Sequence, residues 1–135
     1  MSPRVLIVED EEPLTLLLRY NLEAEGYEVD SVARGDEAEI RMREQMPDIV
    51  LLDWMLPGLS GIELCRRIRV RPETERLPVI MLTANALDEH VRASHDAGAD
   101  QHLSKPIRAT ALIEAIVEAI ASSEAAAERR AVGAA

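Results

Sequence analysis

The chain contains very few aromatic residues and a single cysteine. Its 135 residues include no Phe, one Trp and two Tyr, which together make up 2% of the total. A core built from this composition must be aliphatic, made of Leu, Ile, Val, Ala and Met. The lone cysteine, Cys65, excludes an internal disulfide and favours a cytoplasmic protein. It falls on a predicted amphipathic helix near Leu64 and Ile68, so we expect its thiol to pack in the core.

Long apolar runs and an excess of positive charge are also missing. No apolar stretch approaches the roughly 18 residues that a membrane-spanning helix needs. The first four residues lead into a short strand rather than a signal peptide. The formal net charge of −10 argues against direct binding of nucleic acid, because Lys and Arg must neutralise the phosphates there. We therefore predict a globular domain without a membrane segment, whose acidic surface suits a cation or a basic partner.

Short apolar runs alternate five times with amphipathic helical patterns. Strands are predicted at 4–8, 28–32, 49–53, 79–83 and 101–104, and helices at 12–25, 36–46, 60–71, 86–97 and 107–122. This alternation predicts an α/β fold, a single (βα)5 doubly wound parallel sheet with right-handed crossovers. Acids end the first and third strands, which suggests neighbouring strands at a ligand-binding edge, as in the flavodoxin-like order 2-1-3-4-5.

The predicted domain covers residues 1–121. Leu14, Leu17, Leu18 and Leu22 form an apolar stripe on its first helix, which we expect to be buried against the sheet. Residues 122–135 are rich in Ala, Glu and Arg, and we interpret them as a fraying helix end or a linker stub.

Acidic residues follow two of the predicted strands. Asp53 ends the run from Ile49, and Glu9 and Asp10 follow the first strand. Because burying a lone carboxylate is costly, we expect Asp53 to face a crevice at the strand ends. Three carboxylates at that edge would suit Mg²⁺. For Glu9 to Glu12 alone, an acidic helix N-terminus is an equally good interpretation.

Two further polar residues point to phosphoryl chemistry at the same edge. Thr83 ends the fourth strand, and Lys105 follows the fifth. A hydroxyl can donate a hydrogen bond to a phosphoryl oxygen, and an ammonium group can bind it as a point charge. Each residue alone has an ordinary explanation, but the ordered set predicts a phosphoryl site on a metal.

These motifs together resemble the receiver domains of two-component response regulators. The resemblance spans about residues 4–121 and rests on Glu9-Asp10-Glu11, Asp53-Trp-Met-Leu-Pro57-Gly58-x-x-Gly61, Leu82-Thr83-Ala84, Gly98-Ala99-Asp100 and Lys105-Pro106. It implies that Asp53 is the phosphoacceptor. The donor would be the phosphohistidine of a histidine kinase or a histidine phosphotransfer protein.

The resemblance also implies the roles of the surrounding residues. Phosphorylation would change the face formed by the fourth helix, the fifth strand and the fifth helix, and so control a partner or output. The chain would not be an enzyme beyond its own phosphorylation and dephosphorylation. The implied assignments are Mg²⁺ binding by Asp10, Asp53 and the backbone carbonyl of Met55, with Glu9 acting through water; phosphoryl binding by Thr83, the backbone of Ala84, and Lys105; switching by Thr83; and a cis bond before Pro106.

The chain departs from the family pattern at position 102. His102 stands where the family more often has Tyr or Phe; we hypothesise that it is a switch residue whose inward population falls on protonation, since imidazole changes charge near neutral pH. A surface histidine on an edge strand is the alternative. His90 and His95 are expected on a solvated helix face, and no histidine has the spacing of a metal site.

The two halves of the chain resemble different receivers. The first 83 or so residues resemble the PhoB/OmpR class, whereas the remainder resembles receivers of hybrid histidine kinases, so a natural receiver and a chimera both stay open. The fifth helix, from Arg108, has no Arg along its middle, where that class usually pairs across a dimer. We therefore expect a monomer or a weak dimer.

Two other functions compete with that of a receiver domain. A Mg²⁺-dependent phosphohydrolase with an Asp nucleophile usually needs a second acid two residues later, where this chain has Met55. A protein-binding pseudo-receiver without phosphorylation would normally lack one of the acids, the acceptor or the lysine. Neither glycine-rich nucleotide motif occurs. Met55 and Asn85, beside the acceptor and Thr83, predict slow self-dephosphorylation through shielding of the acyl phosphate by Met55.

Overall fold

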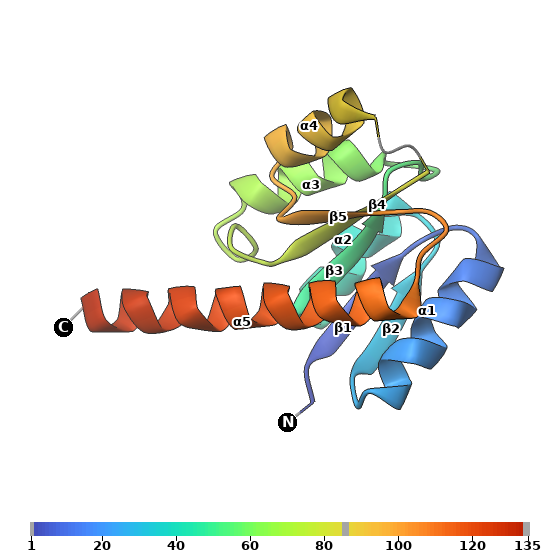
Figure 1. The fold of residues 1–135 in the computed structure, drawn as a ribbon. Helices are drawn as coiled ribbons and strands as arrows, with labels where there is room; N and C mark the ends of the chain where they lie inside the picture. Colours follow the sequence, from blue (N-terminus) through green and yellow to red (C-terminus); the bar gives the residue numbers. More distant parts are fainter. Residues whose placement is uncertain (1, 85–86, 134–135) are drawn as a thin grey trace.

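Five parallel strands alternate with five helices in the computed structural model, which describes residues 2–84 and 87–133 (Figure 1). The strands are β1 (Arg4–Val8), β2 (Glu28–Val32), β3 (Ile49–Asp53), β4 (Val79–Thr83) and β5 (Gln101–Ser104). The helices are α1 (Glu12–Ala24), α2 (Gly35–Glu44), α3 (Gly61–Val70), α4 (Asp88–Asp96) and α5 (Ala109–Gly133). The strand bounds agree with those predicted from the apolar runs.

The strands form one sheet in the order β2-β1-β3-β4-β5, as predicted. β1 lies at the centre of the first half and pairs in parallel with both β2 and β3, with Val5 opposite Val29 on one side and Ile49 on the other. Every crossover therefore returns the chain to the same end of the sheet. The C-terminal ends of β1, β3, β4 and β5 lie along one edge, which is where the predicted site residues fall.

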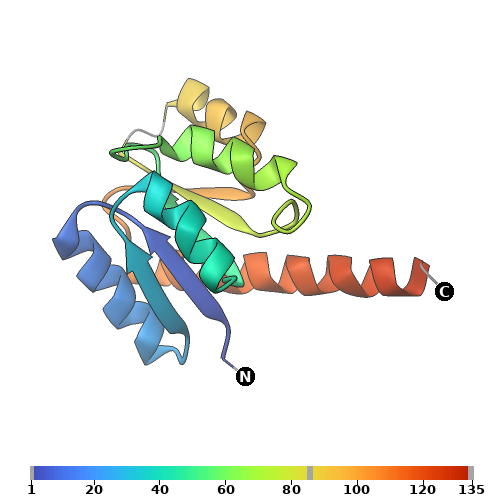
Figure 2. The same cartoon turned by 180° about the vertical axis from the view of Figure 1, so that it is seen from behind.

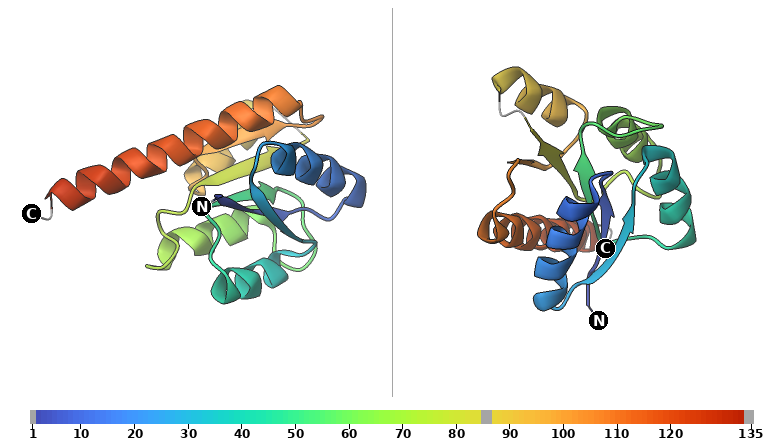
Figure 3. Two further views of the ribbon diagram at one scale, coloured as in Figure 1. Left: turned by 90° about the horizontal axis from the view of Figure 1, so that it is seen from below. Right: turned by 90° about the vertical axis from the view of Figure 1, so that its right-hand side faces the viewer.

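Helices cover both faces of the sheet (Figures 2 and 3). Apolar side chains from α1 and α5 pack on one face and those from α2, α3 and the end of α4 on the other. β3 and β4 are buried along their whole length, since both of their faces are covered. The core is aliphatic, as the composition requires, and Cys65 is fully buried in it beside Leu64 and Ile68.

Two details of the helices differ from the sequence prediction. α5 continues to Gly133 instead of ending near Ser122, because Ala, Glu and Arg favour helix and no breaker interrupts them. In Figures 1 and 3 it runs well past the sheet. On α1, Leu18 and Leu22 are buried, but Leu17 is 50% exposed. The buried face of α1 is therefore narrower than the predicted stripe, which included Leu17.

Within residues 2–84 and 87–133, no helix combines the length and the apolar character needed to cross a bilayer.

Candidate functional site

Three carboxylates meet at the C-terminal edge of the sheet. Asp53 ends β3 and is 3% exposed, Glu9 follows β1 and is 2% exposed, and Asp10 is exposed beside them. One oxygen from each lies within 4.8 Å of the others. A cluster of hard oxygen ligands of this kind suits Mg²⁺, which takes a few carboxylates and keeps several waters.

Lys105 brings a positive charge into this cluster. Its Nζ lies 3.3 Å from Oδ1 of Asp53 and 3.1 Å from Oε1 of Glu9, with the more exposed Glu11 at 3.5 Å. The contact with Asp53 is a hydrogen bond, whereas the angles at Glu9 leave its Oε1 without one. A buried carboxylate oxygen that makes only an ion pair is a free ligand position beside the other two acids.

Backbone hydrogen bonds fix the loops that carry these side chains. The Lys105 N–H donates to the carbonyl of Thr83 at 2.7 Å, and the Trp54 N–H donates to that of Leu82 at 3.0 Å. The Glu11 N–H donates to Oε2 of Glu9 at 2.9 Å. The segments after β3 and β5 are thus tied to β4, and the segment after β1 is held by the side chain of its own Glu9.

Gly61 allows the loop after Asp53 to close tightly. A Cβ at this position would lie 2.1 Å from the carbonyl oxygen of Asp53, a backbone atom that no rotamer change can move. The Gly61 N–H also donates to the Trp54 carbonyl at 3.1 Å. Glycine is therefore required for α3 to begin directly against the segment that follows Asp53.

Burial dominates the electrostatics of the cluster. It raises the pKa of the Glu9 and Asp53 carboxyls above their usual range, against the opposing effect of Lys105. Burial alone would lower the pKa of Lys105, but the carboxylates of Glu9 and Asp53 outweigh it and hold that pKa above its usual value. Burial therefore disfavours the charged form of both acids more than Lys105 favours it.

A cavity of 280 Å³ opens over Asp53. Its walls combine acids, Lys105, Thr83 at 3% exposure, and the 75% exposed Met55. The complete lining is Asp10, Glu11, Asp53, Trp54, Met55, Thr83, Ala84, His90 and Lys105. An anionic group entering this cavity would meet Asp53, a hydroxyl and an ammonium together.

The Lys105–Pro106 bond, for which the resemblance implies a cis peptide, is cis.

His102 and His90 differ in their exposure and in the residues around them. His102 is exposed on the edge strand β5 and lines a separate 80 Å³ cavity with Ser94. His90, expected on a solvated face, is half-buried, and its ring stacks on Trp54 beside Asp53. The sequence offered no signal for this contact, because the loop after β3 and the first turn of α4 are far apart in the chain. Asn85 lies outside the described residues.

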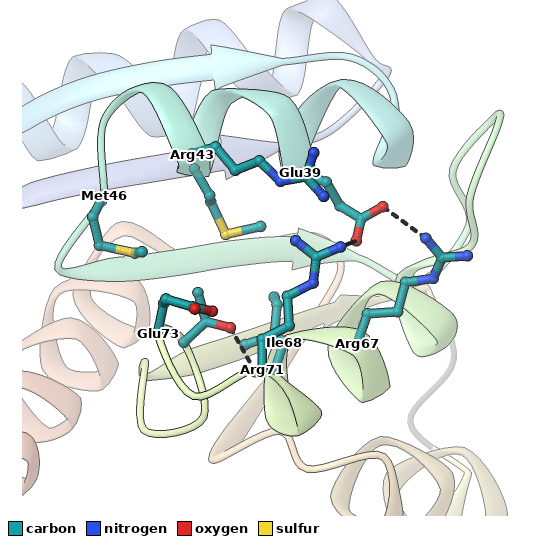
Figure 4. A pocket seen from close by; sticks show the side chains of 9 residues that line it. Glu39, Arg43, Met46, Arg67, Ile68, Arg71 and Glu73 are labelled. Atoms are coloured by element: carbon teal, nitrogen blue, oxygen red, sulfur yellow. Dashed lines mark hydrogen bonds and ion pairs between the residues drawn. The ribbon is translucent and has the colours of Figure 1, made fainter.

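A larger cavity, of 440 Å³, lies away from the acid cluster between α2 and α3 (Figure 4). Arg67 and Arg71 both reach the carboxylate of Glu39 across it, at 2.8 and 3.3 Å. Met42, Met46 and Ile68 also line it. The Arg67 and Arg71 pairs join the two helices, and none of the residues predicted for phosphoryl chemistry lies here.

Comparison with known proteins agrees with this geometry. The profile of the response regulator receiver domain matches residues 5–117. The chain belongs to that family. It is 62% identical over 106 residues to the phosphate regulon transcriptional regulatory protein PhoB of Rhizobium meliloti. The aligned region covers 78% of this chain and 47% of PhoB. The chain thus spans about half the length of the curated relatives it matches. A match of 106 residues in a chain of 135 necessarily includes residue 83, so the similarity to PhoB runs across the possible chimera junction.

Solved receivers share the fold closely. A CheY-like receiver domain protein from Methanospirillum hungatei superposes with a TM-score of 0.84 at 31% identity, covering 92% of this chain and 98% of that one. The receiver domain of a sensor histidine kinase from Pseudomonas aeruginosa, with magnesium coordinated in its active-site cleft, gives 0.83 at 32% identity, covering 90% and 99%. The chain is therefore a receiver domain of the two-component systems, a family whose members interact with histidine kinases and typically bind Mg²⁺.

Proposed function

We propose that Asp53 accepts a phosphoryl group from the phosphohistidine of a partner histidine kinase or histidine phosphotransfer protein. The observation that carries this proposal is the position of the Asp53 carboxylate, in contact with Lys105 and opening into a cavity that Thr83 and Ala84 also line. The resulting aspartyl phosphate changes the face formed by α4, β5 and α5, and through it a downstream partner.

In the transfer, an Asp53 carboxylate oxygen attacks phosphorus as the phosphorus–nitrogen bond of the donor breaks and its electron pair returns to the imidazole. The residues that would hold Mg²⁺ are Asp10, Asp53 and the carbonyl of Met55, with Glu9 acting through water. The donor set fits, since the three carboxylates offer oxygens within 4.8 Å of one another and Oε1 of Glu9 has no hydrogen bond. When bound, Mg²⁺ supplies charge neutralisation between the two approaching anions.

Lys105 supplies the remaining positive charge from the protein. Its Nζ forms ion pairs with both Asp53 and Glu9. A phosphoryl group on Asp53 carries about −1.5 to −2 charges, by analogy with other phosphorylated side chains, and offers Nζ a stronger partner. The hydroxyl of Thr83 and the backbone of Ala84 would bind the other phosphoryl oxygens.

Thr83 and His102 are the proposed switch residues. Movement of Thr83 toward the phosphoryl group would shift the segment between β4 and α4, and His102, exposed on the neighbouring β5, would turn inward. If protonation opposes this turn, NMR of the beryllofluoride-bound protein between about pH 5.5 and 8 will show the inward population falling with acidification. An inward population that does not change with pH would refute the role of protonation.

The decisive experiment is incubation with acetyl phosphate and Mg²⁺, followed by intact mass measurement. We expect one added phosphoryl group on the wild type and on Asp48→Asn, a control at an exposed acid, and none on Asp53→Asn. If the wild type gains no phosphoryl group from acetyl phosphate or from a phosphorylated kinase, the protein is a pseudo-receiver that binds partners without phosphorylation. If it instead hydrolyses unrelated phosphate esters with repeated turnover, it is a phosphohydrolase.

The proposed assembly is a monomer or a weak dimer. The middle of α5 carries Glu114 and Glu118 rather than arginines that could pair with a partner's acids. Light scattering with and without beryllofluoride tests this, and a tight dimer formed only with the phosphoryl mimic would contradict it.

A further inference from the structure

Trp54 and His90 form a stacked pair at the edge of the phosphoryl site. Their ring centroids lie 5.0 Å apart with an interplanar angle of 23°. Trp54 directly follows the phosphoacceptor Asp53, and His90 lies in the first turn of α4. Both rings line the 280 Å³ cavity that contains Asp53 and Lys105. The pair is therefore part of the wall around the acceptor carboxylate.

Both the backbone and the side chain of Trp54 make contacts that hold it in place. The backbone N–H of Trp54 donates to the carbonyl of Leu82 at 3.0 Å, and the backbone carbonyl of Trp54 accepts from the N–H of Gly61 at 3.1 Å. Its half-buried side chain packs against the apolar cluster between the sheet and α2 and α3. With the backbone and this apolar contact fixed, His90 provides the contact of the indole with α4.

The histidine contacts a segment that is distant from it in the sequence. The backbone N–H of His90 donates to the carbonyl of Leu87 at 2.9 Å, within the first turn of α4. α4 follows the segment of Thr83 and Ala84, whereas Trp54 belongs to the loop after β3. The ring–ring contact joins the loop beside the acceptor to the helix that follows the phosphoryl-binding residues, and both residues line the cavity.

We propose that His90 is a positioning residue for the Asp53 site. By stacking on Trp54, it holds the indole as a wall of the cavity, limits the approach of water to the acyl phosphate, and so sets the lifetime of the phosphorylated state. This role rests on the proposed phosphorylation of Asp53. It needs a flat ring at position 90 and no particular protonation state.

Three variants test the proposal. His90→Ala removes the stack, His90→Phe retains a flat ring, and His95→Ala changes an exposed histidine on the same helix. Each protein is phosphorylated with acetyl phosphate and Mg²⁺, the donor is removed, and the loss of the phosphoryl group is followed by intact mass. Acrylamide quenching of Trp54, the sole tryptophan, reports the exposure of the indole in the unphosphorylated protein.

We expect His90→Ala to lose its phosphoryl group roughly two to ten times faster than the wild type, on the scale of one ring–ring contact. Trp54 in that variant should also be quenched more strongly. His90→Phe should restore both properties, and His95→Ala should leave both unchanged. A purely structural role would lower the unfolding midpoint of His90→Ala while leaving the decay rate of the acyl phosphate as in the wild type.

Equal or slower decay in His90→Ala, or failure of His90→Phe to restore the wild-type rate, would overturn the proposal. If His90→Ala does not fold, His90→Leu replaces it, since leucine fills space without a flat ring. A wild type that never gains a phosphoryl group would refute the proposed function instead. The quenching comparison would still show whether His90 holds the indole, so the two failures can be told apart.

Discussion

The ammonium group of Lys105 lies 3.3 Å from Oδ1 of Asp53, although 52 residues separate them in the sequence. Lys105 is the only lysine of the chain, and it lies where two buried carboxylates need a positive charge. A single charge does not fully compensate Glu9 and Asp53, because burial still raises the pKa of both carboxyls. The metal-free site is therefore a local source of instability.

The first prediction concerns stability against pH without metal. Because the folded-state pKa values of Glu9 and Asp53 are raised, the folded protein binds more protons than the unfolded chain between the ordinary carboxyl pKa and the raised one. The free energy of unfolding should thus fall as pH rises through that window and stay lower above it. Urea unfolding in EDTA across this range measures the effect, and Asp53→Asn should weaken it.

Addition of Mg²⁺ should reverse this loss at neutral pH. At a concentration about 100 times the dissociation constant, binding to the folded state alone adds about 2.7 kcal/mol to the free energy of unfolding. The gain should shrink on acidification, as protons compete at Glu9 and Asp53. Glu23→Gln, at an exposed acid on α1, should behave as the wild type. A metal-free stability that rises from pH 5 to 8 would contradict the explanation.

The second prediction concerns the thiol of Cys65. Burial raises its pKa to about 11, so at pH 8 very little thiolate is present and the sulfur is inaccessible. The native protein should react with a thiol reagent such as DTNB only as fast as it opens, and the rate should rise sharply in denaturant. Rapid modification of the native protein would show that α3 is not packed as described.

Much of the fold follows from local patterns that one sequence displays. The strands at Ile49–Asp53 and Val79–Thr83 contain continuous apolar runs, which are typical of a strand covered on both faces. Because parallel strands share their C-terminal edge, the order of the strands was enough to bring Asp53, Thr83 and Lys105 together. The strand order itself followed from the acids after β1 and β3.

The remaining features depend on contacts that no local pattern encodes. Whether His90 faces solvent depends on what packs beside α4, and its partner Trp54 comes from a loop without a helical or strand period. The end of α5 was missed for a different reason. Its Ala-, Glu- and Arg-rich segment has little apolar stripe to indicate packing, although these residue types favour helix, and it continues to Gly133.

The third prediction concerns Gly61. An alanine there would place its Cβ 2.1 Å from the carbonyl oxygen of Asp53, so the loop or the start of α3 must move. We expect Gly61→Ala to lower the free energy of unfolding by roughly 1–3 kcal/mol, the usual cost of overpacking. It should also weaken the response of Trp54 fluorescence to beryllofluoride with Mg²⁺. Arg66→Ala, exposed on the same helix, is the matched control, and equal effects in both variants would argue against the close contact.

The last prediction concerns Met55, two residues after the proposed phosphoacceptor Asp53. Its side chain is 75% exposed yet lines the cavity over Asp53, so it can cover an acyl phosphate without being fixed by the core. Met55→Asn removes this bulk and places an amide that can orient water near the phosphorus. Its phosphoryl group should therefore be lost severalfold faster than that of the wild type, measured by intact mass after the donor is removed. Met55→Leu keeps an apolar side chain of similar volume and should decay at the wild-type rate. An unchanged or slower rate in Met55→Asn would mean that Met55 does not restrict access of water, and that shielding of the acyl phosphate comes from elsewhere in the cavity wall.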